Sequence, residues 1–147
     1  HLATGQAPPH IAGIVRHART REREYDYVLI EAAGGLLVPI DETRTTADLA
    51  RELGYPLLMV APDRLGVLSH VLTACESAHA RDLSVIALVL SPLGDTMRAD
   101  PSPQTNASIL ERRLGIPVLR FPIAPNDDDA LAAAAISCGL LDALGWS

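Results

Sequence analysis

Apolar residues in this sequence form short continuous runs, separated by segments in which they recur every three or four positions. Continuous runs bounded by polar or turn residues are typical of strands that are covered on both faces. The spacing of three or four predicts amphipathic helices. Strands that alternate with helices pair in parallel through right-handed crossovers. The pattern predicts one α/β domain over residues 1–147, with a parallel sheet and helices on both faces. The predicted strands are 28–30, 57–61, 83–90 and 116–121. The predicted helices lie within 10–24, 46–53, 67–81 and 106–114, and an Ala-rich last helix follows 127–129.

Helix ends and loops have their own sequence signals. Polar side chains at the start and glycines at the end set helix boundaries. The predicted caps are Thr45 or Thr46 and Thr105 or Asn106, and the predicted stops are Gly54 and Gly115. Clusters of Pro, Gly and Asp predict loops at residues 1–9, 41–46, 62–66, 93–103 and 122–126.

Composition and charge narrow the class of protein. Of 147 residues, 48% are apolar and 20% charged, as in ordinary globular domains. The net charge of −6 argues against nucleic acid or an anionic membrane as the main partner. No apolar run approaches the roughly 18 residues of a membrane span, and no signal peptide is visible. Cys75 and Cys138 lack metal-type spacing, so we interpret them as buried thiols of a cytoplasmic protein.

The basic residues are all arginines, so the sequence contains no lysine. A phosphate-binding loop of the form G-x-x-x-x-G-K-[ST] therefore does not occur in it. The sequence begins with His1 rather than Met, and we expect a fragment or a processed chain.

Candidate chemistry gathers where the predicted strands end, because ligands of open α/β sheets bind at the carboxyl edge. Glu31 ends the first apolar run, and Gly34 and Gly35 follow with N–H groups that no side chain crowds. A carboxylate beside such donors suits a metal ion next to an anionic ligand. A solvated acid followed by a tight turn, with Glu31 paired to Arg44 or Arg64, would have the same sequence, and this alternative stays open.

The next loop leads into a predicted helix near residues 66–69, where free N–H groups of a first turn favour an anion. A simple loop glycine at Gly66 and an ordinary surface hydroxyl at Ser69 are the alternative. His70 and His79 lie nine residues apart, about opposite each other on one helix, so they cannot share a site. A structural or solvated role is the interpretation for both.

Several collinear segments, within residues 1 to about 125, carry a family resemblance. They are Glu31-Ala-Ala-Gly-Gly-Leu-Leu-Val-Pro39, Ala47-Asp-Leu49, Pro62-Asp-Arg-Leu-Gly66 with Ser69-His70, and Thr105-Asn106 with Pro117-Val-Leu119 and Pro122. Together they resemble dethiobiotin synthetase. The resemblance implies a P-loop NTPase-like fold that is incomplete at the amino terminus here, and a homodimeric, Mg²⁺-dependent enzyme of biotin biosynthesis. In that family CO2 converts 7,8-diaminononanoate to a carbamate, ATP phosphorylates the carbamate, and ring closure expels phosphate.

The resemblance also implies roles for individual residues. Glu31 matches the Mg²⁺-binding acid. The implied ATP-binding residues are Glu31, Ala32, Ala33, Gly34, Ser91, Pro92, Pro122, Ile123 and Ala124, and the implied substrate-binding residues are Gly34, Gly35, Leu65, Gly66 and Ser69. Ala32 stands where the family has a glycine, and Ser91 and Ser69 stand where it often has Asn. No residue of this chain is assigned as catalytic.

The resemblance leaves more than one function open. In one, the chain is the carboxyl-terminal part of a dethiobiotin synthetase, inactive alone and competent with the P-loop half, which a separate chain could supply. In the other, it is a non-catalytic domain of the same fold for nucleotide sensing or dimerisation. A related amidoligase of cobalamin synthesis is a weaker enzyme alternative.

Overall fold

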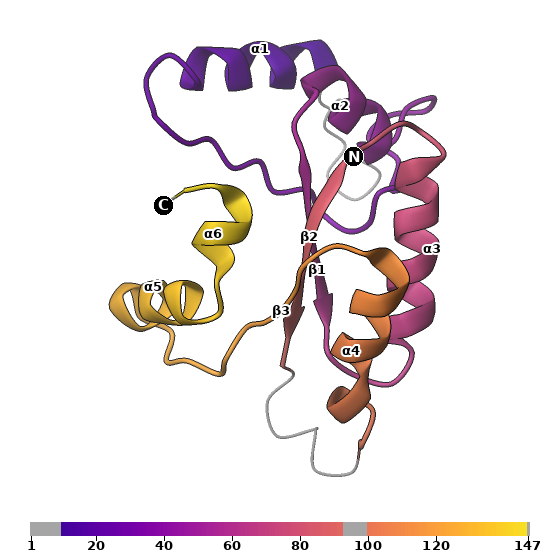
Figure 1. The fold of residues 1–147 in the computed structure, drawn as a ribbon. Helices are drawn as coiled ribbons and strands as arrows, with labels where there is room; N and C mark the ends of the chain where they lie inside the picture. Colours follow the sequence, from indigo (N-terminus) through magenta and orange to yellow (C-terminus); the bar gives the residue numbers. More distant parts are fainter. Residues whose placement is uncertain (1–9, 93–99, 147) are drawn as a thin grey trace. The chain divides into compact units, whose positions relative to one another are not determined.

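A computed structural model describes residues 10–92 and 100–146 (Figure 1). The loop predicted at 1–9, and residues 93–99 of the loop predicted at 93–103, lie outside the described residues. The chain divides into two compact units, which we describe separately. The first unit comprises residues 1–55 and 77–83, and the second comprises residues 56–76 and 84–147.

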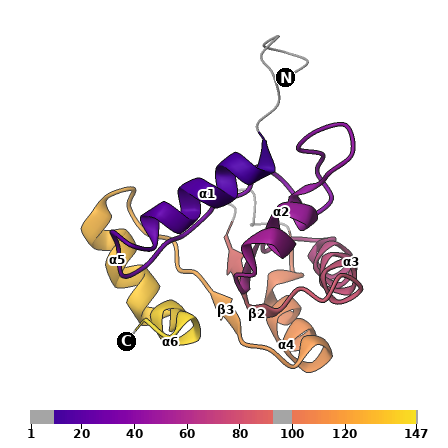
Figure 2. The same cartoon turned by 90° about the horizontal axis from the view of Figure 1, so that it is seen from above.

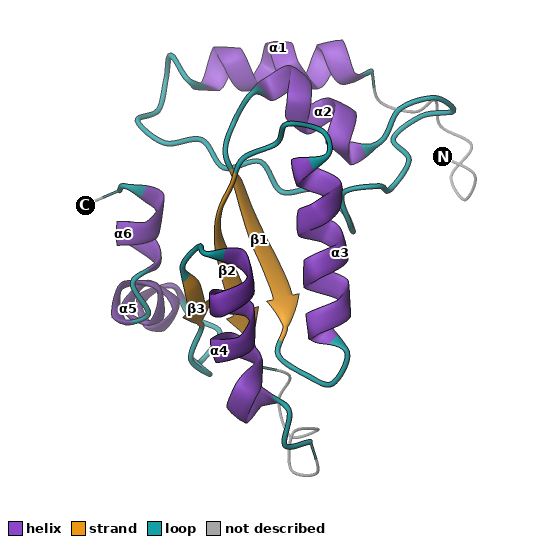
Figure 3. Ribbon diagram, turned by 45° about the vertical axis from the view of Figure 1, so that its right-hand side comes forward, coloured by secondary structure: helices purple, strands orange, loops and turns teal. Residues whose placement is uncertain are grey.

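The second unit is built on a parallel sheet. Its strands β1 (Leu57–Pro62), β2 (Val85–Ser91) and β3 (Val118–Arg120) lie in the order β1-β2-β3, and both pairings are parallel. These strands confirm three of the four predicted ones, but the predicted burial of β1 is wrong, because this strand is only partly buried and Val60 is 66% exposed. Helices α3 (Val67–His79) and α4 (Pro103–Leu114) lie on one face of the sheet, and α5 (Asp128–Ser137) and α6 (Leu140–Leu144) lie on the other (Figures 2 and 3). The predicted parallel sheet with helices on both faces is therefore confirmed.

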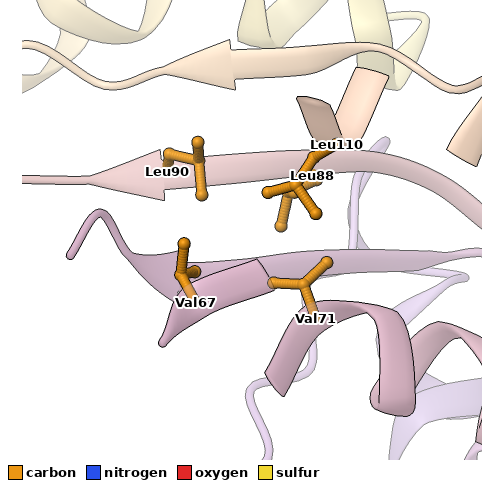
Figure 4. Packing of buried hydrophobic residues seen from close by; sticks show 5 residues of the cluster. All are labelled: Val67, Val71, Leu88, Leu90 and Leu110. Atoms are coloured by element: carbon orange, nitrogen blue, oxygen red, sulfur yellow. The ribbon is translucent and has the colours of Figure 1, made fainter. Parts of the chain in front are cut away.

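The core of this unit follows from the two-residue period of β2. Leu88 and Leu90 point toward α3 and α4, where they meet Val67, Val71 and Leu110 (Figure 4). The alternate residues Ala87 and Val89 are also buried, on the face where α6 packs against β2. A strand buried on both faces needs a continuous apolar run, which is the pattern of 85–90.

The helices of the second unit correct two predicted boundaries. Helix α4 begins at Pro103 after Ser102, so Thr105 and Asn106 are not caps but lie within the helix. Asn106 is only 2% exposed, and its amide is bonded to a distant residue instead of the helix start. The Ala-rich last helix is broken at Gly139, whose positive φ of 77° separates α5 from α6. The predicted stop at Gly115 is confirmed, with φ of 65°.

The first unit contains two helices, α1 (Ile11–Arg21) and α2 (Thr46–Leu53). They pack through a small cluster of apolar side chains, with Ile11, Ala18, Leu49 and Leu53 buried at its centre. Thr45 caps α2: the Asp48 carboxylate accepts hydrogen bonds from the Thr45 N–H (2.8 Å) and hydroxyl (2.9 Å). Gly54 ends α2 in the left-handed conformation, as predicted.

The strand predicted at residues 28–30 is wrong. The segment has no strand structure, and Leu29 in its middle is 70% exposed, although Ile30 packs beside the α1–α2 cluster. An apolar run allows burial, but a strand also needs a neighbouring backbone to pair with its N–H and C=O groups. Among the described residues no such partner pairs with 28–30.

No helix of the described ranges is long and apolar enough to cross a membrane.

Candidate functional site

Glu31 follows residues 28–30 in the first unit and is exposed. Its carboxylate makes no hydrogen bond or ion pair with the described part of the chain. The alternative partner Arg44 is engaged elsewhere, with its Nη2 2.7 Å from Asp41 Oδ2 and its Nη1 3.9 Å from Glu52 Oε1. As far as the described residues go, Glu31 therefore presents an exposed carboxylate without a partner at the start of the loop.

The loop after Glu31 turns at Gly34, whose φ of +87° lies in the left-handed region that side chains disfavour. A Cβ built at this position would lie 3.0 Å from Val38 Cγ2, so space as well as conformation calls for glycine. Gly35 has neither constraint, since no atom lies within 4 Å of its built Cβ. The glycine needed by the loop geometry is thus the first of the pair.

The backbone N–H groups of Ala33, Gly34 and Gly35 donate no hydrogen bond within residues 10–92 and 100–146. All three residues are exposed, and so is Ala32, whose methyl group this chain accommodates without burial. Open donors beside an open carboxylate can bind an anion and a cation together, as in an anion accompanied by a divalent metal. Among the described residues the loop thus holds an exposed carboxylate and exposed N–H donors, and metal and anion binding by this loop stays a prediction.

Hydrogen bonds to the start of α2 hold the far side of this loop. The Thr46 N–H donates to Val38 O (2.9 Å) and the Ala47 N–H to Leu36 O (2.8 Å). Asp41 closes the following turn, because hydrogen bonds from the Thr43 N–H and the Arg44 side chain stabilise its carboxylate and lower its pKa. The carboxylate of Asp41 is therefore occupied in holding the turn.

In the second unit the parallel strands bring three predicted segments to one edge of the sheet. The Asp63 N–H after β1 donates to Ser91 O at the end of β2 (2.8 Å), and the Phe121 N–H after β3 donates to Leu90 O (2.9 Å). Ser91 and Pro92 are partly exposed, as is Ala124, and Ile123 is 77% exposed beside an exposed Pro122. The segments at 62–66, 91–92 and 121–124 thus share an edge, while the Glu31 loop belongs to the other unit.

Helix α3 begins at this edge. Gly66 precedes it with φ of +92°, and Leu65 before it is 77% exposed. The Val67 N–H donates to Arg64 O and the His70 N–H to Gly66 O, whereas those of Leu68 and Ser69 find no acceptor in the described residues. Two free donors at the positive end of a helix favour an anion there.

Three residues near this helix start were not singled out from the sequence as site residues. Asn106 Nδ2 on α4 donates to Asp63 Oδ1 at 2.8 Å, and Asp100 Oδ2 accepts from the Leu65 N–H at 2.7 Å. The nearby Ser102 hydroxyl, together with hydrogen bonds from the N–H groups of Ser102 and Leu65, lowers the pKa of Asp100. The partners lie 43 and 35 residues apart in the sequence, so no local pattern announces them.

No group of three His, Cys, Asp or Glu side chains able to hold a metal occurs among the described residues. Mg²⁺ beside a nucleotide needs less, because one or two carboxylates, phosphate oxygens and water complete its octahedron. The single exposed carboxylate of Glu31 could therefore be the protein ligand of such an ion.

Comparison with known proteins identifies relatives over most of the chain. A family model described as AAA domain matches residues 5–129. Proteins named ATP-dependent dethiobiotin synthetase are similar to this chain. The one from Rhodopirellula baltica is 41% identical over 69% of this chain and 44% of its own length. The one from Aromatoleum aromaticum is 38% identical over 76% of this chain and 48% of its own, and the one from Caulobacter sp. (strain K31) is 35% identical over 87% and 55%. The chain spans about half the length of the curated relatives it matches.

Proposed function

Because the chain belongs to the AAA domain family, and within it to the dethiobiotin synthetases, we propose that it is the carboxyl-terminal part of such an enzyme. In this function the assembled enzyme closes the ureido ring of 7,8-diaminononanoate with CO2 and ATP, in biotin biosynthesis. The observation that carries the proposal is the loop at 31–35. Within residues 10–92 and 100–146, its carboxylate and three N–H groups have no hydrogen-bond partner, and they flank a glycine that the loop geometry requires.

Each of the proposed binding segments, taken within its own unit, has a chemical role. Glu31 would hold Mg²⁺ together with phosphate oxygens, and the metal would neutralise charge on the nucleotide. The N–H groups of residues 33–35 would donate to phosphate or carbamate oxygens. Ser91 and Pro92, with residues 122–124, would contact the adenine. The donors of Leu68 and Ser69 at the start of α3, beside Leu65 and Gly66, would receive the carboxylate of diaminononanoate bound mainly to a second subunit of a homodimer.

Phosphoryl transfer depends on positioning and on neutralising charge. This sequence has no lysine, so the P-loop lysine of the proposed enzyme must come from a segment outside it, in the same or in another chain. We propose that residues 1–147 alone do not turn over. We place the enzyme in the cytoplasm, where Cys75 and Cys138, both free thiols in the structure, would stay reduced.

The absence of lysine also favours a second function, a non-catalytic domain that senses nucleotide or forms dimers. The two functions differ in what accompanies the chain. The DNA upstream of His1 should encode a G-x-x-x-x-G-K-[ST] motif about 100 residues earlier, a domain-scale distance. The protein from that reading frame should form dethiobiotin from diaminononanoate, bicarbonate and Mg-ATP, and residues 1–147 alone should not. An intact P-loop frame whose product binds ATP but forms no dethiobiotin would refute the enzymatic proposal.

A further inference from the structure

The loop before α3, residues 63–66, is held by polar side chains from distant parts of the second unit. Asn106 Nδ2 donates to Asp63 Oδ1 (2.8 Å) and to Arg64 O (3.4 Å). Asp100 binds the loop from outside, since its Oδ2 accepts from the Leu65 N–H (2.7 Å) and its Oδ1 from the Ser102 N–H (2.9 Å). We call Asp63, Asp100 and Asn106 the loop clamp.

Two of the three clamp residues, Asp63 and Asn106, are buried, which is unusual for a carboxylate and an amide. Asp63 is 6% exposed and Asn106 is 2% exposed. Asn106 lies one turn before the fully buried Leu110 on α4, at an interior position where an apolar side chain would ordinarily pack. Burying a carboxylate and an amide costs hydration free energy, and their mutual hydrogen bond offsets that cost without adding net stability. Asn is also a weak helix former, so it does not favour this helix locally. What the pair specifies is the conformation of the loop, because Asn106 bonds both the Asp63 side chain and the Arg64 carbonyl.

Asp100 fixes the loop at Leu65, whose side chain is not packed against the core. The Leu65 side chain is 77% exposed, so contacts with the core do not determine where its backbone lies. The hydrogen bond from its N–H to Asp100 does. Gly66 then turns with φ of +92° into α3, whose Leu68 and Ser69 N–H groups have no acceptor in the part of the chain that the structure describes. The direction of these two donors therefore depends on how the preceding loop is held.

We infer that Asp100 and Asn106 are positioning residues, which act through residues 63–66 to aim the α3 donors at the substrate carboxylate. They touch no reacting atom. The inference rests on the proposed function, since that function supplies the carboxylate. A correctly aimed donor pair lowers the concentration of diaminononanoate needed for binding and leaves the nucleotide site unaffected. Loss of this aim should therefore raise the KM for diaminononanoate and leave the KM for ATP unchanged.

The test uses Asp100→Asn in the protein that contains this chain together with its P-loop-bearing part. Asn keeps the size, and its oxygen can still accept from the Ser102 N–H, but its amide nitrogen cannot accept from the Leu65 N–H. The matched control is Asp129→Asn, which removes the same charge from an exposed carboxylate without a partner in the described residues. Asn106→Ala, assayed where circular dichroism shows native folding, tests the buried half of the clamp.

Two measurements together decide the inference. Exchange of the Leu65 amide, followed by NMR, should become about tenfold faster in Asp100→Asn, which is the scale of one hydrogen bond to a charged group. The KM for diaminononanoate should rise about tenfold, while the KM for ATP and kcat stay within about twofold. Asp129→Asn should match the unmodified protein in both.

Each contrary result has its own meaning. Unchanged Leu65 exchange would show that the clamp does not hold the loop in solution and would overturn the inference. Faster exchange with an unchanged KM for diaminononanoate would make Asp100 a structural residue only, again overturning it. If the unmodified protein binds ATP but forms no dethiobiotin, the proposed function fails first, and the substrate role of the clamp falls with it.

Discussion

Gly34 offers the sharpest test of the loop that carries the proposed function. We predict that Gly34→Ala destabilises the first unit, whereas Gly35→Ala does not. The neighbouring glycines differ in two structural respects: only Gly34 has a positive φ, +87°, and only its built Cβ meets another atom, Val38 Cγ2 at 3.0 Å. The pair is therefore a control within the loop itself.

The expected magnitude comes from these two terms. A side chain in the left-handed region costs about 1–2 kcal/mol. A carbon–carbon approach of 3.0 Å is well inside the usual contact distance, and turning Val38 off its rotamer to relieve it costs about 0.5–1.5 kcal/mol. Replacing glycine also restricts the unfolded chain, which returns about 0.4–1 kcal/mol. The net loss of unfolding free energy should be about 0.5–3 kcal/mol for Gly34→Ala. Gly35→Ala should be neutral or slightly stabilising.

Urea unfolding measures this difference, and the chain offers a probe for each unit. Tyr25, Tyr27 and Tyr55 all lie in the first unit, and the single tryptophan, Trp146, lies in the second. The tyrosine transition should move to lower urea in Gly34→Ala. Adding Val38→Ala should recover the steric part of the loss but not the conformational part. Equal midpoints for the Gly34 and Gly35 variants would refute the argument that the loop geometry requires glycine at 34.

Four further predictions address the proposed metal ligand, the core, a helix cap and association. In the protein that includes the P-loop part, Glu31→Gln should lower the rate of dethiobiotin formation about 10- to 100-fold and raise the Mg²⁺ requirement, as expected for a disturbed ligand environment; normal turnover at limiting Mg²⁺ would make Glu31 structural. Leu110→Ala, at a fully buried site, should cost about 2–5 kcal/mol in urea unfolding, against less than about 1 kcal/mol for the partly exposed Leu131→Ala, and similar losses would contradict the core assignment. Hydrogen bonds from the Thr45 N–H and hydroxyl lower the pKa of Asp48, so its contribution to stability is complete above the unfolded pKa of about 4 and is lost as pH falls through the lower folded pKa. The stability difference between the unmodified protein and Asp48→Asn should accordingly be constant near neutral pH and shrink below about pH 4, and a difference independent of pH would count against the cap. Light scattering should give a dimer at tens of micromolar, an order of magnitude suited to a stable interface, and a monomer would oppose the proposed homodimer.

Much of the fold is predictable because its signals are local. Gly54 and Gly115 end their helices in the left-handed conformation that glycine adopts without strain, so the residue type alone marks the boundary. The run at 85–90 forms a strand because both faces of β2 are covered, and continuous burial requires continuous apolar side chains. The open edge after the strands follows from parallel pairing, which the alternation of strands and helices already implies.

The candidate site was predictable only where its chemistry lies in a contiguous segment. Glu31 with residues 33–35 could be predicted as a candidate because the acid and the small residues are neighbours, and their polar groups have no partner among the described residues. Asp100 and Asp63 were not, because their partners are 35 and 43 residues away, and spatial proximity created by folding has no periodic signature in the chain. Asn106 even carries a misleading local signal, since an Asn near the start of a helical pattern resembles a cap.

The sequence by itself determined which segments can be buried, where helices stop, and which loops carry an acid or free backbone donors. These properties depend on the residue and its near neighbours. The tertiary structure decided which apolar run pairs into a sheet and which polar side chains meet. Residues 28–30 and 57–61 have the same pattern, but among the described residues only the second is paired with a backbone that completes its hydrogen bonds. From the sequence, Asn106 could cap a helix or lie in a buried position. In the folded chain it is buried, because its amide donates a hydrogen bond to Asp63. The physical reason is that a hydrogen bond needs its partner in place, and only the folded chain puts it there.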